Sequence, residues 1–293
     1  MRSLVRLARD SARDFARRPL ALLTCALACG LLLVQVGCAS RGDAVAISGV
    51  EVLEHTPTIG LDVENVRGAV LINVNPKISA PRVVAYAGTH RGQPAENRSA
   101  DKWVTAQITE SDGRAVLAVR SVPYDGVEDL WVQVAIEVPS CDGLRVRNSD
   151  GTVDARGVNG AITIENGGAG RPGGYVYIAP GKPTTSPISI TTASGDIELV
   201  LPSESTGNVE LISANGKLAA IVAWTGQITN SVIKPGMYTG ILNWGTNPIR
   251  LKTGEGEVRM HIGPYRFGNP QIRYYNNWWF SSIERTGDVI RRA

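Results

Sequence analysis

Six acidic side chains in the middle of the chain are the residues whose type best suits catalysis. Paired carboxyl groups act as general acid and general base on glycosidic bonds when a fold brings them to one face. Polar side chains at the outward positions of strands explain the same residues without any reaction, and we favour that interpretation. The six residues are Asp150, Asp154, Glu165, Asp196, Glu198 and Glu210.

Other residues that could carry catalysis or hold a metal ion are few and scattered. His55, His90 and His261 show no ligand spacing. Cys141 is the single cysteine after residue 38, so it has no C-x-x-C partner. The G-x-S-x-G motif of the α/β hydrolases is also missing from the sequence. We therefore expect a protein that is not an enzyme, with no catalytic residue, no cofactor and no metal ion.

The first 37 residues have the pattern of an export signal. Residues 1–18 form a basic leader, and residues 19–37 follow without a charged side chain. Residues 1–38 hold six Arg and two Asp, a charge of +4, so the rest of the chain carries about −1 of the total of +3. The basic character therefore lies in the signal, and the rest of the chain has no basic run with interleaved aromatics. We expect no nucleic-acid partner.

Cys38 directly follows the apolar segment and is the candidate for lipidation. Val36 and Gly37 fit the bacterial lipobox that precedes an acylated cysteine, whereas Gln35 stands where Leu is usual. We predict a signal peptide over residues 1–38 and a lipoprotein anchored to the outer membrane or in the periplasm through Cys38. The alternatives are cleavage near Ala39, which gives a secreted protein, and an uncut signal anchor of nineteen apolar residues. All three place the body outside the cytoplasm.

The body of the chain shows the pattern of short β-strands separated by glycine turns. In residues 143–201 apolar and polar side chains alternate with a period of two, as in half-buried strands. A small or polar residue, Gly, any residue and then Val, Ile or Leu recur along the chain. Gly supplies the positive φ that a tight turn requires. The glycines of this element are Gly68, Gly151, Gly160, Gly195, Gly216, Gly226 and Gly256.

Two all-β architectures fit this pattern. Turn spacings near multiples of ten favour a single-stranded, right-handed-type parallel β-helix or β-solenoid, whose coils stack on one another. A β-sandwich with many hairpins is the alternative. We expect coils from about residue 61 to residue 262, with Gly151, Gly160 and Gly195 at turns and Val153, Ile162 and Ile197 facing inward. Residues 103–119, with Ser111, Asp112 and Gly113 at the centre, have the pattern of a hairpin whose loop exceeds two residues.

The C-terminal tail differs in composition from the strands. Residues 265–293 hold seven of the seventeen aromatic residues together with five Arg. Such a tail can cap the last coil, or it can contact a partner or the membrane surface, where Trp and Tyr are enriched. The expected organisation is a signal over 1–38, a linker over 39–58, a β-solenoid domain over 59–263 and an aromatic tail or cap over 264–293. The residues with a possible partner or membrane contact are Tyr274, Tyr275, Trp278, Trp279 and Phe280.

The ordered series of strand and turn motifs resembles the bacterial putative-adhesin family, a domain of unknown function whose members are exported or membrane-tethered β-solenoids. The motifs that carry this resemblance are LDVENVRGAVLIN (61–73), Val138-Pro139, LRVRNSDGTVDARGVNGAITI (144–164), SGDI (194–197) and EGEV (255–258).

The resemblance implies architecture and location in the cell envelope and transfers no catalytic residue. A non-enzymatic scaffold, an adhesin-like protein or a binding module for an envelope glycan or protein follows from it. The alternatives are an enzyme that acts on envelope polysaccharide and an exported partner of an envelope-stress regulatory system.

Overall fold

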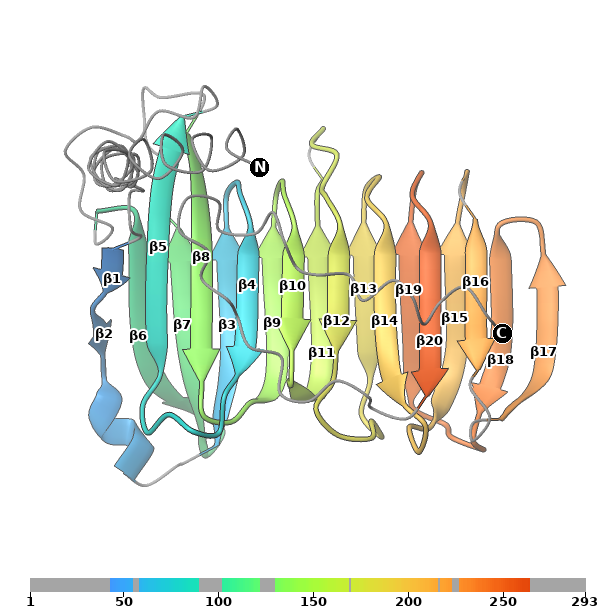
Figure 1. Cartoon of the computed structure of the whole chain (residues 1–293), viewed down its shortest axis with the longest axis horizontal. Helices are drawn as coiled ribbons and strands as arrows, with labels where there is room; N and C mark the ends of the chain where they lie inside the picture. Colours follow the sequence, from blue (N-terminus) through green and yellow to red (C-terminus); the bar gives the residue numbers. More distant parts are fainter. Residues whose placement is uncertain are drawn as a thin grey trace, which may run out of the picture. The chain divides into compact units, whose positions relative to one another are not determined.

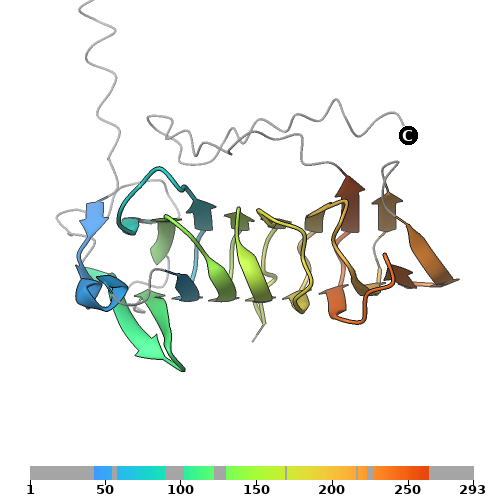
Figure 2. The ribbon, with the colours of Figure 1, turned by 90° about the horizontal axis from the view of Figure 1, so that it is seen from below.

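The computed structural model describes residues 43–54, 58–89, 102–121, 130–168, 170–215, 217–222 and 227–263. These residues form two mixed β-sheets that face each other, and neither sheet closes on itself (Figure 2). A short 3₁₀ helix, η2 (Val50–Glu54), lies near the start, and no described residue belongs to an α-helix. The all-β prediction is therefore confirmed. In the described ranges no helix has the length and hydrophobicity to cross a membrane.

Nine strands form sheet A (Figure 1). In spatial order they are β1 (Asp43–Val45), β5 (Arg82–Thr89), β8 (Leu130–Val138), β4 (Val70–Val74), β10 (Val153–Arg156), β12 (Val176–Ala179), β14 (Ile197–Pro202), β20 (Val258–Gly263) and β16 (Leu218–Val222).

Eleven strands form sheet B. In the same direction they are β2 (Ile47–Ser48), β6 (Val104–Ser111), β7 (Arg114–Ser121), β3 (Ile59–Asn65), β9 (Asp142–Asn148), β11 (Asn159–Asn166), β13 (Ile188–Thr192), β19 (Pro248–Thr253), β15 (Gly207–Ser213), β18 (Met237–Leu242) and β17 (Ile228–Lys234).

The middle of each sheet is parallel, and antiparallel pairs occur at the β1 end of sheet A and near both ends of sheet B, whereas the outermost strands β16 and β2 pair parallel. Sheet A is parallel from β8 to β16, and sheet B is parallel from β7 to β15. Strands β1 and β5 at one end, and β17 and β18 at the other, pair antiparallel, as do β6 and β7. The prediction of a purely parallel arrangement is therefore wrong where strands β1, β5, β6, β17 and β18 pair antiparallel.

From β7 to β16 successive strands alternate between the two sheets, and two further pairs stack among them out of chain order. Strands β3 and β4 lie between the later pairs β7/β8 and β9/β10, and β19 and β20 lie between β13/β14 and β15/β16. The blue strands among green ones and the dark orange strands among yellow ones show these insertions in Figure 1. Strands far apart in the sequence are therefore neighbours in both sheets.

The core lies between the sheets and consists of the inward side chains of alternate strand positions. Val153, Ile162 and Ile197 are fully buried, as predicted, and each pairs in register with an apolar residue of the neighbouring strand. Each strand therefore covers the apolar edge of the next one, which is how repeated short strands build one continuous core.

Glycines stack at the turn that leads from sheet B to sheet A. A Cβ atom on Gly151, Gly174, Gly195 or Gly256 would lie against the backbone of the glycine in the neighbouring turn. Only hydrogen fits at these positions, so the recurring glycine is required by close approach of backbones. Gly151 also has a positive φ, of +118°, whereas the other three do not.

Two turn predictions need correction. Gly160 lies inside β11, at a shift of register against β9, and its φ of +74° serves this irregularity and no turn. In the β6–β7 hairpin, Ser111 pairs with Arg114, so the loop has only two residues. Both of them, Asp112 and Gly113, have positive φ, which is the type I′ geometry that matches the twist of a hairpin.

Candidate functional site

The six acidic residues of the sequence analysis do not form one cluster. Asp154 and Glu198 lie on the outer face of sheet A, whereas Glu165 and Glu210 lie on the outer face of sheet B. The other two belong to turns: Asp150 faces Arg67 with N–O distance 3.4 Å, and Asp196 accepts a hydrogen bond from the backbone of Glu257.

The outer face of sheet A holds a group of polar and aromatic side chains, which we call the sheet A polar cluster. Its members share two adjacent rows of the sheet or the turn before β12. They are Asp154, Arg156, Tyr175, Tyr177, Glu198, Arg259 and His261.

Asp154 is engaged by its own strand neighbour. Arg156 donates hydrogen bonds from Nε and Nη2 to the two carboxylate oxygens, at 2.8 and 2.9 Å, and its guanidinium also lies 4.8 Å from the centre of the Tyr177 ring. Burial raises the pKa of the Asp154 carboxyl, and the hydrogen bonds from Arg156 oppose that shift. With an exposed fraction of 4%, this carboxyl is closed off from a substrate.

Glu198 occupies the other half of the sheet A polar cluster. Its carboxylate accepts a 2.6 Å hydrogen bond from the Tyr175 hydroxyl and lies 3.9 Å from His261 Nε2. Burial lowers the pKa of His261, which keeps the imidazole neutral at pH 7. His261 Nε2 is buried without a hydrogen bond, because the distance of 3.9 Å to the Glu198 carboxylate is too long for one. The cluster holds its charged groups in pairs, which is the arrangement of a structural polar network.

The outer face of sheet B also carries polar side chains on successive strands. Outward side chains at the same register position form rows across the parallel strands. One row contains Asp62, Arg145, Thr163, Ser189, Arg250 and Glu210. The next row contains Arg120, Glu64, Arg147, Glu165, Thr191 and Lys252.

Opposite charges alternate at the two ends of these rows. Arg120 contacts Asp62 at 2.6 Å and Glu64 at 3.3 Å, and Arg147 contacts Glu64 at 2.7 Å. At the far end Arg250 contacts Glu210 at 2.5 Å. Exposed pairs of this kind contribute little to stability, typically below about 1 kcal/mol each. Their arrangement therefore sets the surface chemistry more than the stability of the fold.

A band of hydroxyl groups separates the charged ends. Thr163, Ser189 and Thr191 lie on β11 and β13, between Arg145 on one side and Arg250 on the other. The two arginines are three strand spacings apart, about 14 Å, and their side chains are 49% and 62% exposed. This face offers accessible cations around a centre of hydroxyl groups and one carboxylate, that of Glu165, so it is our candidate site for contact with a partner.

Glu165 and Glu210 of this face were among the six acidic candidates, but the cationic positions of the face were not predicted from the sequence. The signal that could have found it is the pair of motifs Arg145-x-Arg147 and Arg250-x-Lys252. Residues two apart in a strand point to the same side of a sheet, so each motif places two cations on one face. The motifs do not indicate the strand pairing that brings β9 and β19 into one sheet.

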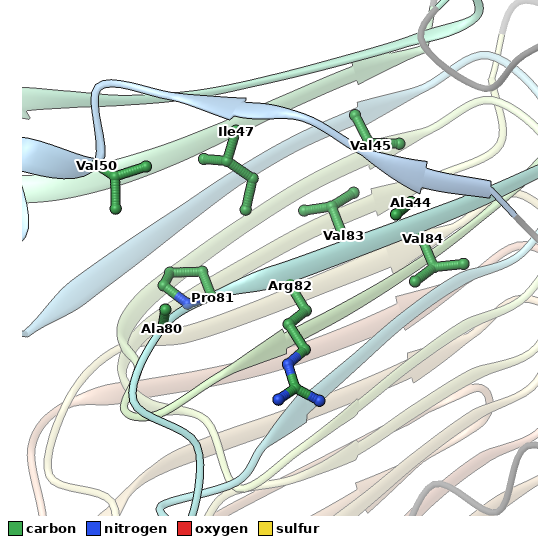
Figure 3. Close-up of a pocket in the computed structure, with 9 residues that line it drawn as sticks. All are labelled: Ala44, Val45, Ile47, Val50, Ala80, Pro81, Arg82, Val83 and Val84. Atoms are coloured by element: carbon green, nitrogen blue, oxygen red, sulfur yellow. The ribbon is translucent and has the colours of Figure 1, made fainter.

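A small apolar pocket lies at the end of the stack that holds β1 and β2, among β1, β2, η2 and β5 (Figure 3). It measures about 330 Å³. Ligand sites combine apolar walls with a few placed polar groups, and the one charged side chain here, Arg82, extends away from the apolar ones. The lining residues are Ala44, Val45, Ile47, Val50, Ala80, Pro81, Arg82, Val83 and Val84. We assign no function to this pocket.

Cys141 is a buried structural residue. Its side chain is 2% exposed, and burial raises the pKa of the thiol to about 12. A thiol of this kind stays protonated and unreactive at neutral pH. Among the described residues no group of His, Cys, Asp and Glu is arranged to hold a metal ion.

The predicted lipidation and contact residues lie outside the described ranges. This applies to Cys38 and to the aromatic residues of the tail, which are Tyr274, Tyr275, Trp278, Trp279 and Phe280.

Comparisons with known proteins give little guidance. No protein-family model matches the chain, and no curated protein matches it. One solved structure, described as that of a putative cell adhesion protein from Clostridium sporogenes ATCC 15579, is similar with 10% sequence identity and a TM-score of 0.43. The match covers 71% of this chain and 94% of that one.

Proposed function

We propose that this protein is an exported, lipid-anchored binding module of the bacterial cell envelope, without enzymatic activity. In this proposal the strands form a β-solenoid that holds the outer face of sheet B towards an envelope glycan or protein. The observation that carries the proposal is the uninterrupted row from Asp62 through Arg145 and Arg250 to Glu210, in which charges and hydroxyls lie in register. Stacked strands present long faces of this type to extended partners.

The solenoid interpretation has support from the pairing within the stack. Each of the pairs β9/β10, β11/β12 and β13/β14 gives one strand to each sheet, and neighbouring pairs are parallel. The stacked glycines of the connecting turns add to this support. In a sandwich of hairpins, successive strands would instead pair within one sheet.

The anchor is tested by labelling cells with a fatty-acid analogue and separating their membranes. The wild-type protein should carry label and stay with the membrane, and Cys38→Ser should lose both. Mass spectrometry of the N-terminus then identifies the processed residue. An unlabelled protein that begins at Ala39 or later would contradict the anchor and leave export intact.

The binding face is tested by charge removal on sheet B. In the Cys38→Ser protein, which lacks the lipid anchor, Arg145→Ala combined with Arg250→Ala should weaken attachment of the protein to isolated cell envelopes at least tenfold. Lys77→Ala, which removes an exposed cation from the loop between β4 and β5, serves as the matched control and should bind like wild type. Equal binding by all three proteins would contradict the assignment of this face.

The enzymatic alternative is tested on the same preparation. If the protein cleaved envelope polysaccharide, Glu198→Gln in the sheet A polar cluster should abolish the cleavage. We expect no release of reducing ends from wild type. Release that depends on Glu198 would replace the binding module by a glycan-acting enzyme.

A further inference from the structure

The turn between β18 and β19 carries a tryptophan that the fold does not explain. Trp244 is 74% exposed, and among the large apolar side chains of the described ranges only Ile233 is more exposed. Its φ is +61°, a left-handed conformation that is uncommon for residues other than glycine and asparagine. A bulky residue in this region costs on the order of 1–3 kcal/mol. Because the Trp244 side chain is exposed, burial of the indole ring does not offset this cost.

The neighbouring residue fixes this conformation. Asn243, with φ of +44°, donates from Nδ2 to the carbonyls of Ser203 and Ser205, at 2.7 and 2.8 Å, and accepts from the Gln227 backbone at 3.0 Å. The Gly245 amide donates to the Leu242 carbonyl at 3.0 Å, which closes a four-residue turn. With both central φ values positive, this is a type I′ turn. Trp244 therefore stands on a rigid support.

Three loops join to form the surface around the turn, namely residues 182–187, 203–207 and 243–247. Thr206 donates from its hydroxyl to Asn247 Oδ1 at 3.2 Å, and Asn247 donates from Nδ2 to the Ser186 carbonyl at 3.0 Å. The Thr206 amide donates to the Thr184 carbonyl at 2.9 Å. The loops are thus held together by direct hydrogen bonds.

The side chains of this surface are mainly hydroxyls and amides. Lys182 and Glu204 are the charged residues of the three loops, and their charges cancel. The other exposed polar side chains of these loops are Thr185 and Thr246. A neutral surface gives no attraction for nucleic acid or anionic lipid. An exposed indole ring among hydroxyls and amides suits a neutral sugar, which has both apolar C–H faces and hydroxyl groups.

We propose that Trp244 is a stacking platform for a neutral, hydroxyl-rich glycan, with the loops 182–187, 203–207 and 243–247 as the polar surround. The strain at residue 244 is explained because the rigid turn presents the indole face already ordered, which reduces the entropy lost on binding. This inference deepens the proposed function, on which it rests, by naming a partner class and a contact residue.

The test is affinity electrophoresis of the full-length protein, solubilised in detergent, in gels that contain dextran, xylan, glucomannan or laminarin. At least one of these glycans should retard the wild type. Trp244→Ala should raise the dissociation constant at least tenfold, whereas Trp244→Phe should stay within about threefold. Ile233→Ala, which removes an equally exposed apolar side chain from β17, is the matched control and should bind like wild type. Circular dichroism confirms that the variants are folded.

Three results would overturn the inference. The first is that none of the four glycans retards the wild type. The second is that wild type and Trp244→Ala are retarded equally. The third is that Trp244→Ala loses binding to phospholipid vesicles or to a partner protein while its binding to glycans is unchanged. The envelope attachment assay with the Arg145 and Arg250 variants separates this failure from failure of the proposed function. Attachment that persists in wild type while all glycans fail contradicts only the role of Trp244.

Discussion

Asn148 Nδ2 donates a hydrogen bond to Asn166 Oδ1 at 3.0 Å across the pair β9/β11, with exposed fractions of 2% and 1%. Asn148 also accepts from Asn65 Nδ2 at 3.1 Å. The row continues with Thr192, Thr253 and Ser213, whose hydroxyls donate to carbonyls of the stacked glycines. A buried row of side chains thus satisfies the turn carbonyls between the two sheets, so that few polar groups there are left without a partner.

Asn148→Ala should therefore destabilise the protein by about 2–3 kcal/mol, since buried donors and acceptors on both neighbouring strands lose a partner. Urea unfolding followed by circular dichroism measures the effect. Asn208→Ala is the matched control, because this exposed asparagine of β15 should change stability by less than about 0.5 kcal/mol. Similar values for the two variants would contradict a structural role for the row.

Gly195→Ala should be costly because of contact between neighbouring turns. The φ of Gly195 is not positive, yet a Cβ atom there would lie against the carbonyl of Gly174. We expect a loss of about 3 kcal/mol, at the upper end of the usual cost of overpacking.

Gly113→Ala separates the steric cause from the conformational one. Gly113 has φ of +71°, and the space that a Cβ atom would occupy there is open, so its replacement should cost only the left-handed strain of about 1 kcal/mol. Thermal unfolding of both variants gives the comparison. A loss at Gly195 no larger than that at Gly113 would exclude tight stacking of the turns.

The sequence predicted the strands and most turns because their causes are local. Alternation identifies the inward positions of Val153, Ile162 and Ile197, and glycine identifies the connections at Gly151 and Gly195. The order of the strands has no local signal. Nothing in residues 248–263 indicates that they insert between β13/β14 and β15/β16, because parallel neighbours are selected by long-range packing.

The candidate sites were less predictable for the same reason. Asp154 was expected on a solvated face, and it does point outward, but Arg156 and Tyr177 enclose it. No sequence pattern identified Trp244 as a candidate contact residue, because that role is inferred from its backbone conformation and its exposure. Both properties depend on the turn that Asn243 fixes through contacts with residues some forty positions away.

His261 should make stability depend on pH. Burial lowers its pKa below the ordinary value of 6.5, while Glu198 opposes the shift and Arg259 adds to it. The unfolded chain then binds the proton more tightly than the folded protein does. The contribution is fully present above about pH 6.5 and is lost as the pH falls towards the lower pKa of the folded state.

The free energy of unfolding should therefore fall between pH 7 and pH 5.5 more steeply for wild type than for His261→Gln. Urea titrations at four pH values give the two slopes, and the other two histidines are common to both proteins. Parallel slopes would show that the imidazole titrates alike in the folded and unfolded states.

Trp244→Gly should stabilise the protein, in contrast to most substitutions. Glycine adopts φ near +61° without a Cβ clash, and the exposed indole ring gives up little burial, so we expect a gain of about 0.5–1 kcal/mol. Asn243→Gly is the control at the adjacent left-handed position. It should destabilise by about 1–3 kcal/mol, because its side chain makes three hydrogen bonds to other loops. If the strain at residue 244 is kept for binding, urea unfolding should show a gain in stability for Trp244→Gly and a loss for Asn243→Gly. A loss of stability in both variants would mean that the indole ring supports the fold.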